Sequence, residues 1–212
     1  AFADNFIIIH DYTPNQRVRI GGSQSIFGQL NATFYVFFVY LHITKIRHCF
    51  GMQHINIRPI QPEDNQAIEQ VVRDVFIELE TPQVGTAYAD PQLKLMFETY
   101  DKPKAIYFVV EINGKIIGGA GVSQLENEDE SICELQKMYF LSEARGLGLG
   151  IVLMEKCLAK AKEFGFESCY LETMPYMKDA QKLYRKVGFE YLDKPLGNTG
   201  HTSCPVWMLK KL

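Results

Sequence analysis

The chain has 212 residues, of which 47% are hydrophobic and 22% are charged, and its formal net charge is -3. A chain of this length and composition can bury one full hydrophobic core with room for an appendage, which indicates a globular protein. The small negative charge, without any block of lysine and arginine, argues against nucleic acids and other polyanions as partners.

Cysteine usage bears on the cellular compartment. The five cysteines are an odd number, are widely spaced and contain no Cys-x-x-Cys pair: Cys49, Cys133, Cys157, Cys169 and Cys204. This pattern indicates neither a disulfide framework nor a zinc site. We therefore expect a protein of the reducing cytoplasm that holds no metal.

Residues 1–51 allow three interpretations. Their aromatic, β-branched run at residues 34–41 is too short to span a bilayer, which takes about 20 apolar residues, and the basic region and cleavage site of a signal peptide are missing. A membrane anchor, an extra element packed on the domain and a poorly ordered leader stay open. The chain opens on Ala1, and the sequence from Met52 onward resembles the start of a domain. We therefore expect residues 1–51 to be an extension or leader and residues 52–212 to be a folded domain, and we expect no membrane partner.

The first elements of the domain follow from periodicity. Residues 54–60 alternate apolar and polar side chains, as a strand does, and Pro62-Glu63-Asp64 then begins a helix. A loop rich in proline and glycine leads to a shorter helix near residues 92–100. The first helix has one buried face, formed by Ile68, Val71, Val72, Val75, Phe76 and Leu79.

A hairpin follows. Residues 105–112 and 115–124 are joined by Asn113-Gly114, the strongest short-range signal for an antiparallel pair. Three glycines leave the second strand without side chains at their positions. This predicts that another backbone or a ligand approaches closely there, or that the strand contains a β-bulge. The three glycines are Gly118, Gly119 and Gly121. The acidic run at residues 126–130 is interpreted as a solvated loop, and the attraction of a cationic amine is the alternative.

The turn Arg145-Gly146-Leu147-Gly148-Leu149-Gly150 lies between an apolar stretch, residues 135–141, and an amphipathic one, residues 151–164. Its glycines permit positive φ and close approach, and the following helix directs free N–H groups and its positive dipole end at the turn. The turn therefore predicts an anion site. A nucleoside-triphosphate loop would need Gly-Lys-Ser/Thr, and a dinucleotide fingerprint would need Gly-x-Gly-x-x-Gly, so neither motif fits. A pyrophosphate held without a metal, with Arg145 beside it, remains.

The rest of the chain continues the alternation of helices and strands. The helix after the glycine turn ends at Phe164-Gly165, and residues 167–173 form the next strand, parallel to the strand at residues 131–140. A second helix, residues 177–187, is capped by Gly188. Residues 189–192 and 202–209 supply the closing strands.

Two motifs in register resemble one family. The strand at residues 134–140 followed by Arg-Gly-Leu-Gly-Leu-Gly and a helix is similar to the acetyl-CoA signature of the GNAT superfamily of N-acetyltransferases, and residues 180–189 resemble its Ala-x-x-Leu-Tyr-x-x-x-Gly-Phe segment. The resemblance covers roughly residues 52–212. It implies an α/β (α+β) fold, a mixed, mostly antiparallel sheet flanked by helices, in which the central strands at residues 131–140 and 167–173 splay apart and admit the cosubstrate.

The resemblance also implies catalytic roles. Glu134 matches the strand-borne glutamate that takes the proton of the amine, often through water, whereas a surface glutamate is the alternative. Tyr184 matches the tyrosine that donates a proton to the leaving thiolate, with a buried core tyrosine as the alternative. The backbone N–H of Met138 would bond the thioester oxygen and stabilise the charge that develops there.

The implied cosubstrate is acetyl-CoA, bound by main-chain groups. Met138, Tyr139 and Phe140 would pair with the pantetheine arm as if it were another strand. The pyrophosphate would bind the N–H groups of Arg145, Gly146, Leu147, Gly148, Leu149 and Gly150. One departure puts contacts in doubt, since Met177 stands where many members have an asparagine. Lys178, Lys182 and Lys186 could meet the 3′-phosphate, although exposed helix lysines are the commoner explanation.

The tail contains His201 and Cys204, which could be a nucleophile and base or a metal pair, but which we interpret as structural. The loop at residues 196–201 is the alternative wall of the acceptor pocket. We predict transfer of acetyl from acetyl-CoA to a primary amine, in a small molecule or a peptide, by direct attack in a ternary complex. A non-catalytic CoA-binding sensor or interaction module is the second hypothesis, and a homodimer is left open.

Overall fold

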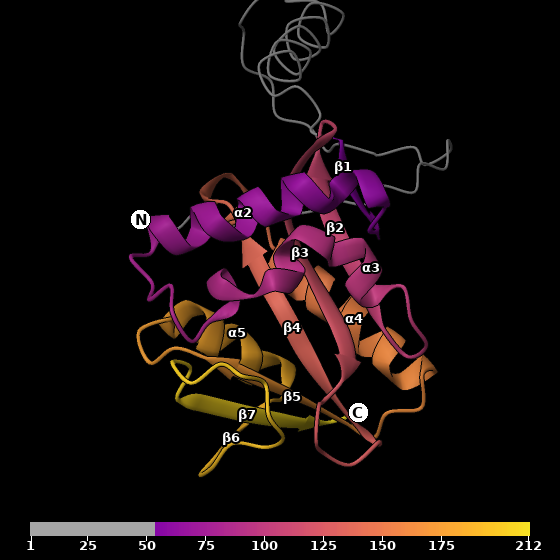
Figure 1. Ribbon diagram of the computed structural model, residues 1–212, viewed down its shortest axis with the longest axis vertical. Helices are drawn as coiled ribbons and strands as arrows, with labels where there is room; N and C mark the ends of the chain where they lie inside the picture. Colours follow the sequence, from indigo (N-terminus) through magenta and orange to yellow (C-terminus); the bar gives the residue numbers. More distant parts are fainter. Residues whose placement is uncertain (1–53) are drawn as a thin grey trace, which may run out of the picture. The chain divides into compact units, whose positions relative to one another are not determined.

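The structure is a computed structural model that describes residues 54–212, all of which belong to the unit Met52–Leu212 (Figure 1). The interpretations of residues 1–51 lie outside the described residues. Within the described part of the chain, no helix is long and apolar enough to cross a membrane.

Among residues 54–212, seven strands form one sheet in the order β1-β2-β3-β4-β5-β7-β6. Only β4 and β5 are parallel neighbours, so the sheet is mixed and mostly antiparallel, as predicted. The strands are β1 Ile55–Pro59, β2 Ile106–Ile112, β3 Lys115–Gln124, β4 Ile132–Phe140, β5 Ser168–Thr173, β6 Glu190–Leu192 and β7 Val206–Lys211.

Helices cover both faces of this sheet and create two cores. On β2, Phe108 and Val110 belong to a core formed with α4 and α5, whereas Tyr107 and Val109 belong to a core formed with α2 and α3. The alternation follows from the period of two along a strand. The α-helices are α2 Asn65–Glu78, α3 Met96–Tyr100, α4 Leu149–Glu163 and α5 Lys178–Val187, and the 3-10 turns are η1 Pro62–Asp64, η2 Ala87–Ala89, η3 Pro91–Leu95 and η4 Ser142–Ala144. Figure 1 shows α2 and α3 on the near side of the strands and α4 behind them.

The parallel pair β4–β5 is short. Only Ile132 to Glu134 pair with Ser168 to Tyr170, and beyond Glu134 the two strands part, which confirms the predicted splay. A β-bulge adds to it, because Gly119 pairs with Tyr139 while Gly121 pairs with Gln136, so that β4 carries one extra residue. Lys137 takes up the bulge with a φ of 50°.

The glycines of β3 make room for aromatic rings. A Cβ on Gly121 would lie 2.7 Å from the ring of Tyr107 and 2.8 Å from that of Tyr100, and a Cβ on Gly118 would lie 2.3 Å from Phe140. Both alternatives from the sequence are therefore partly right. The bulge exists, with its extra residue on β4, and the close neighbours are aromatic side chains together with backbone carbonyls of the adjacent strands.

Two predicted boundaries need correction. The helix expected at residues 92–100 is split into η3 and α3, because Leu95 leaves helical geometry with φ -132° and ψ 45°. The last strand begins at Val206 and not at residue 202, since Pro205 has no N–H to donate and the N–H of Ser203 bonds the carbonyl of Gly85 instead.

Candidate active site

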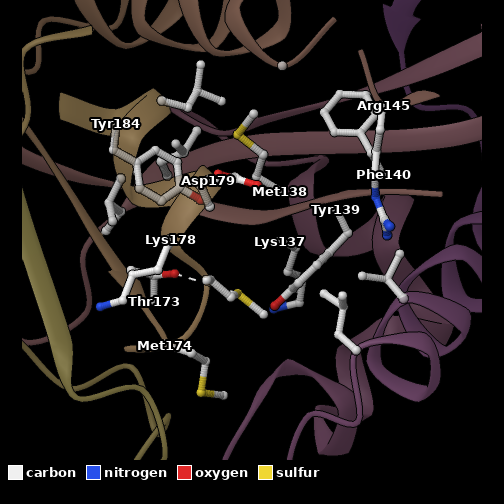
Figure 2. Close-up of a pocket in the computed structure, with 18 of the residues that line it drawn as sticks. Lys137, Met138, Tyr139, Phe140, Arg145, Thr173, Met174, Lys178, Asp179 and Tyr184 are labelled. Carbon is white, nitrogen blue, oxygen red and sulfur yellow. Dashed lines mark hydrogen bonds between the residues drawn. The ribbon is translucent and has the colours of Figure 1, made fainter. Parts of the chain in front are cut away.

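A cavity of about 810 Å³ opens where β4 and β5 part. Its walls come from α2, β4, the glycine turn, the start of α4, β5 and α5. In Figure 2, Tyr184 reaches in from the α5 side, and Lys137 and Tyr139 project from β4. The cavity lies at the gap predicted from the sequence.

The glycine turn forms one end of the cavity. Gly146 and Gly148 have φ of 77° and 72°, and a Cβ on either would meet nothing within 4 Å. Positive φ therefore explains these two glycines, and the space above them is open. Gly148 is the N-cap of the 15-residue helix α4 and no side chain caps it, so the first N–H groups of the helix are available to an anion.

Arg145 is not a free cation beside this turn. Its Nη1 and Nη2 donate to the two carboxylate oxygens of Glu78 at 2.6 and 2.8 Å. This bidentate ion pair joins the end of α2 to the glycine turn, and the carboxylate of Glu78 partly neutralises the charge of the guanidinium. Arg145 still lines the cavity and is labelled in Figure 2.

Glu134 lies at the last residue where β4 and β5 still pair, with 6% of its surface exposed. Burial raises the pKa of its carboxyl to about 7, and the charge of Glu172 adds to this effect, while a hydrogen bond from Gln136 and the charges of His201 and Lys137 oppose it. Glu134 does not line the cavity, although its neighbours Leu135 and Lys137 do. The alternative of an exposed surface glutamate is wrong.

Tyr184 lies on the buried face of α5 and lines the cavity, with 8% of its surface exposed. Its ring packs edge-on against Phe189 at 6.1 Å, so it is also a core residue. Burial raises the pKa of its hydroxyl to about 12. Among the described residues, no side chain or backbone group bonds this hydroxyl, which leaves it available to a ligand.

A charged cluster lies beside the cavity and reaches it through Lys137, which is one of the lining residues. Lys137 Nζ lies 2.7 Å from Asp90 Oδ2, and His201 Nε2 lies 3.2 Å from the same oxygen. The side chain of Lys137 is only 5% exposed. Burial disfavours the charge on His201, but the hydrogen bond and the charge of Asp90 outweigh it and raise the pKa of His201. The cluster joins the loop before η3, the bulge of β4 and the loop before β7.

His201 and Cys204 do not act as a pair. His201 bonds Asp90, and burial raises the pKa of the Cys204 thiol to about 12, so the thiolate is scarce at neutral pH. The structural interpretation of Cys204 is therefore favoured over a nucleophile. Within residues 54–212, no group of three or more His, Cys, Asp or Glu side chains could hold a metal.

Most of the residues selected from the sequence meet at this cavity. It is lined by Met138, Tyr139, Phe140, Arg145, Gly146, Gly148, Leu149, Gly150 and Tyr184. Leu147 is not part of the lining and is 45% exposed. Of the three lysines of α5, only Lys178 lines it.

Sequence reasoning missed two groups of residues. Phe76 of α2 and Leu79, which follows the last residue of α2, line the cavity, although the sequence assigned both to a buried helix face. For Leu79 that assignment is wrong, because it is 39% exposed. Asp90 and Lys137 gave no signal, because their contact depends on the bulge. Met177, which replaces the expected asparagine, does line the cavity and accepts a weak hydrogen bond from Thr173 Oγ1 at its sulfur, drawn as a dashed line in Figure 2.

Comparisons with known proteins agree with this geometry. The model of the acetyltransferase (GNAT) family matches residues 73–189. An uncharacterized N-acetyltransferase of Escherichia coli K12, YjgM, is 43% identical over 165 residues, which cover 74% of this chain and 99% of the relative.

Solved structures share the fold. A GNAT-family acetyltransferase of Staphylococcus aureus Mu50 has a TM-score of 0.67 at 20% identity, covering 74% of this chain and 99% of that one. An acetyltransferase of Salmonella typhimurium, solved with its cofactor acetyl-CoA, has a TM-score of 0.61 at 18% identity, covering 74% and 94%. On the family match and the E. coli relative together, this chain belongs to the GNAT family of N-acetyltransferases and is an acyltransferase.

Proposed function

We propose that this enzyme transfers acetyl from acetyl-CoA to a primary amine by direct attack within a ternary complex. The observation that carries the proposal is that two suitable groups occur in this region. Glu134 is a buried glutamate at the point where β4 and β5 part, with a pKa of about 7. Tyr184 has a hydroxyl and lines the cavity. One group can take a proton at neutral pH, and the other can give one.

The residues of the cavity fit coenzyme A. The open space above Gly146 and Gly148 and the uncapped start of α4 suit a diphosphate. Beyond Glu134, β4 has no pairing with β5, so that backbone groups near Met138 can pair with an extended, amide-containing arm. The Salmonella relative of the same fold was solved with acetyl-CoA, which supports this assignment.

Each residue has a distinct task. When bound, acetyl-CoA supplies the acyl group as a thioester. Glu134, which lies behind the cavity wall, accepts the proton of the amine through water. The backbone N–H of Met138 donates to the thioester oxygen, and the Tyr184 hydroxyl gives its proton to the departing thiolate.

The acceptor is proposed to enter beside Lys137, which lines the cavity and pairs with Asp90. Asp90 also bonds His201, which belongs to the loop at residues 196–201 that the sequence offered as a wall of the acceptor pocket. A small molecule or a peptide with a free amine fits the proposal. A cytoplasmic location is part of it, since all four described cysteines are free thiols.

The test is thiol release from acetyl-CoA with a panel of amines, run for the wild type and for Glu134→Gln. The wild type should turn over at least one amine, with a rate that rises through about pH 7. Glu134→Gln should lose that rise and keep its affinity for acetyl-CoA. Tight CoA binding without turnover of any amine would instead support a non-catalytic CoA-binding module.

A further inference from the structure

The base proposed above is held by a hydrogen-bonded relay that crosses from the sheet to α3. Gln136 Nε2 donates to Glu134 Oε2 at 2.7 Å, and the hydroxyl of Tyr100 donates to Gln136 Oε1 at 2.8 Å. Glu134 and Gln136 are two residues apart on β4, so their side chains share one face of the strand. The relay therefore runs Tyr100, Gln136, Glu134.

The far end of the relay is fixed by packing. Tyr100 is 5% exposed, and its ring packs on that of Tyr107 at 5.1 Å. Tyr107 in turn donates its hydroxyl to the carbonyl of Lys137 at 2.9 Å, next to the bulge. Gly121 leaves the room that the Tyr100 ring occupies. The hydroxyl of Tyr100 thus has a defined position beside Gln136.

The direction of the Gln136 amide follows from its two neighbours. Burial raises the pKa of Tyr100 well above its ordinary value, so that its hydroxyl keeps its proton and can donate to Oε1. The amide N–H groups then face Glu134. An ionised carboxylate only accepts hydrogen bonds, and a donor at this point stabilises the charged form of a buried acid.

We propose that Gln136 is a positioning residue that holds the ionised carboxylate of Glu134 for proton transfer, and that Tyr100 fixes the direction of the Gln136 amide. The proposal rests on the proposed function for the role of Glu134 as base. It assigns to Gln136 the task of keeping Glu134 usable at neutral pH, because burial alone would keep that carboxyl protonated.

Other titratable groups also act on Glu134, and all of them are kept in Gln136→Met. The charges of Lys137 and His201 favour its ionised form, and the charge of Glu172 disfavours it. Further ionisable groups that lie close enough to interact with it are Tyr100 on α3, Cys169 and Tyr170 on β5, and Cys204 before β7. None of these is replaced in Gln136→Met, so a change in that variant reports on the amide.

The test is a direct titration of Glu134 by carbon NMR, with the carboxyl carbons of glutamate labelled and Glu134→Gln used to assign the resonance. Gln136→Met keeps the length of the side chain and removes the donor. Its Glu134 resonance should titrate about one to two pH units higher than in the wild type, since a hydrogen bond to a charged group is lost. Tyr100→Phe should move it in the same direction by less.

The matched control is Gln124→Met, at an exposed position near the end of β3, which should leave the titration of Glu134 unchanged. A Glu134 resonance that titrates at the same pH in the wild type and in folded Gln136→Met would overturn the proposal. If Gln136→Met does not fold, the titration of Glu134 in Tyr100→Phe is the test. A resonance that titrates at the wild-type pH in Tyr100→Phe would then overturn the proposal.

The dependence of kcat/KM on pH separates this proposal from the proposed function. If Glu134 is the base, the midpoint of the rise should move upward in Gln136→Met by the amount seen in the NMR titration. If the resonance moves but Glu134→Gln keeps the wild-type pH profile, the relay stands and the role of Glu134 as base is wrong.

Discussion

Glu134 and Tyr184 are both buried acids, and burial affects the opposite tasks that we propose for them in different ways. It brings the pKa of Glu134 up to about 7, where the carboxyl can take a proton near neutral pH. It brings the pKa of Tyr184 up to about 12, which keeps the hydroxyl protonated until a stronger base appears. An ordinary thiol has a pKa of about 8.5, so the proposed transfer of this proton to a departing thiolate is uphill at equilibrium and requires the thiolate to form directly beside the hydroxyl.

Replacing Tyr184 with phenylalanine should therefore lower kcat by about 100-fold or more, the usual size of a general-acid contribution. The Kd for acetyl-CoA should change little, because the ring and its contact with Phe189 remain. Steady-state kinetics and calorimetry check both values. Tyr191→Phe is the control, because the Tyr191 hydroxyl donates to Gln181 and does not line the cavity. This variant should keep the wild-type kcat.

The glycine turn offers a second test at the level of one residue. Gly148→Asp adds a negative charge to the proposed diphosphate site, where repulsion at about 4 Å is on the order of 4 kcal/mol. Affinity for CoA should fall by about three orders of magnitude in calorimetry.

Gly114→Asp is the matched control for this charge. Gly114 has a φ of 80° and open space around a Cβ, like Gly148, but it lies in the turn between β2 and β3 and not on the cavity. Both variants carry similar backbone strain. If the two variants bind CoA with equal affinity, the assignment of the diphosphate to the glycine turn is wrong.

At the scale of elements, β3 and α4 use glycine for different reasons. Gly121 faces the rings of Tyr100 and Tyr107, and a methyl group there would also lie 2.6 Å from the carbonyl of Ile106. Gly121→Ala should lower the free energy of unfolding by about 1–3 kcal/mol, the usual cost of overpacking. Urea denaturation measures the change.

Gly150→Ala provides the contrast. Gly150 lies inside α4, and its added methyl group would be 3.0 Å from the end of the Leu183 side chain, which can move. Since alanine favours a helix over glycine, stability should stay within about 1 kcal/mol of the wild type. A loss as large as that of Gly121→Ala would contradict this explanation of the two glycines.

The same elements show what the sequence could predict. Periodicity and turn chemistry, which depend on short stretches of sequence, predict the helices α4 and α5 and the left-handed cap at Gly188. The family resemblance predicts the splay of β4 and β5. The left-handed Lys137 could not be predicted, because an extra residue in β4 is defined only against Ala120 on β3. The contact of Asp90 with His201 was equally hidden, since it spans 111 residues.

At the scale of the whole domain, this long-range pair joins two loops that lie far apart in the sequence. His201 Nε2 bonds Asp90, and nearby the N–H of Ser203 donates to the carbonyl of Gly85. The loop before β7 is thereby fastened to the segment that precedes η3. We expect this fastening to depend on pH through His201.

The pKa of His201 is raised in the folded protein, so its stabilising effect is complete below the unfolded pKa of about 6.5 and is lost as pH rises through the higher folded value. The wild type should exceed His201→Gln in free energy of unfolding by more at pH 6 than at pH 8.5. Urea titrations at the two values measure the difference. A gap between the two proteins that does not change with pH would contradict the pairing.

The position of β7 has a consequence for synthesis on the ribosome. It is the last strand in the chain, yet it lies inside the sheet, between β5 and β6. Until residues 206–211 have left the exit tunnel, β6 has no neighbour and β5 presents a bare edge to other nascent chains. The sheet thus stays open between β5 and β6 until β7 has been synthesised, and we expect chaperones that shield open strands to act on it at that stage.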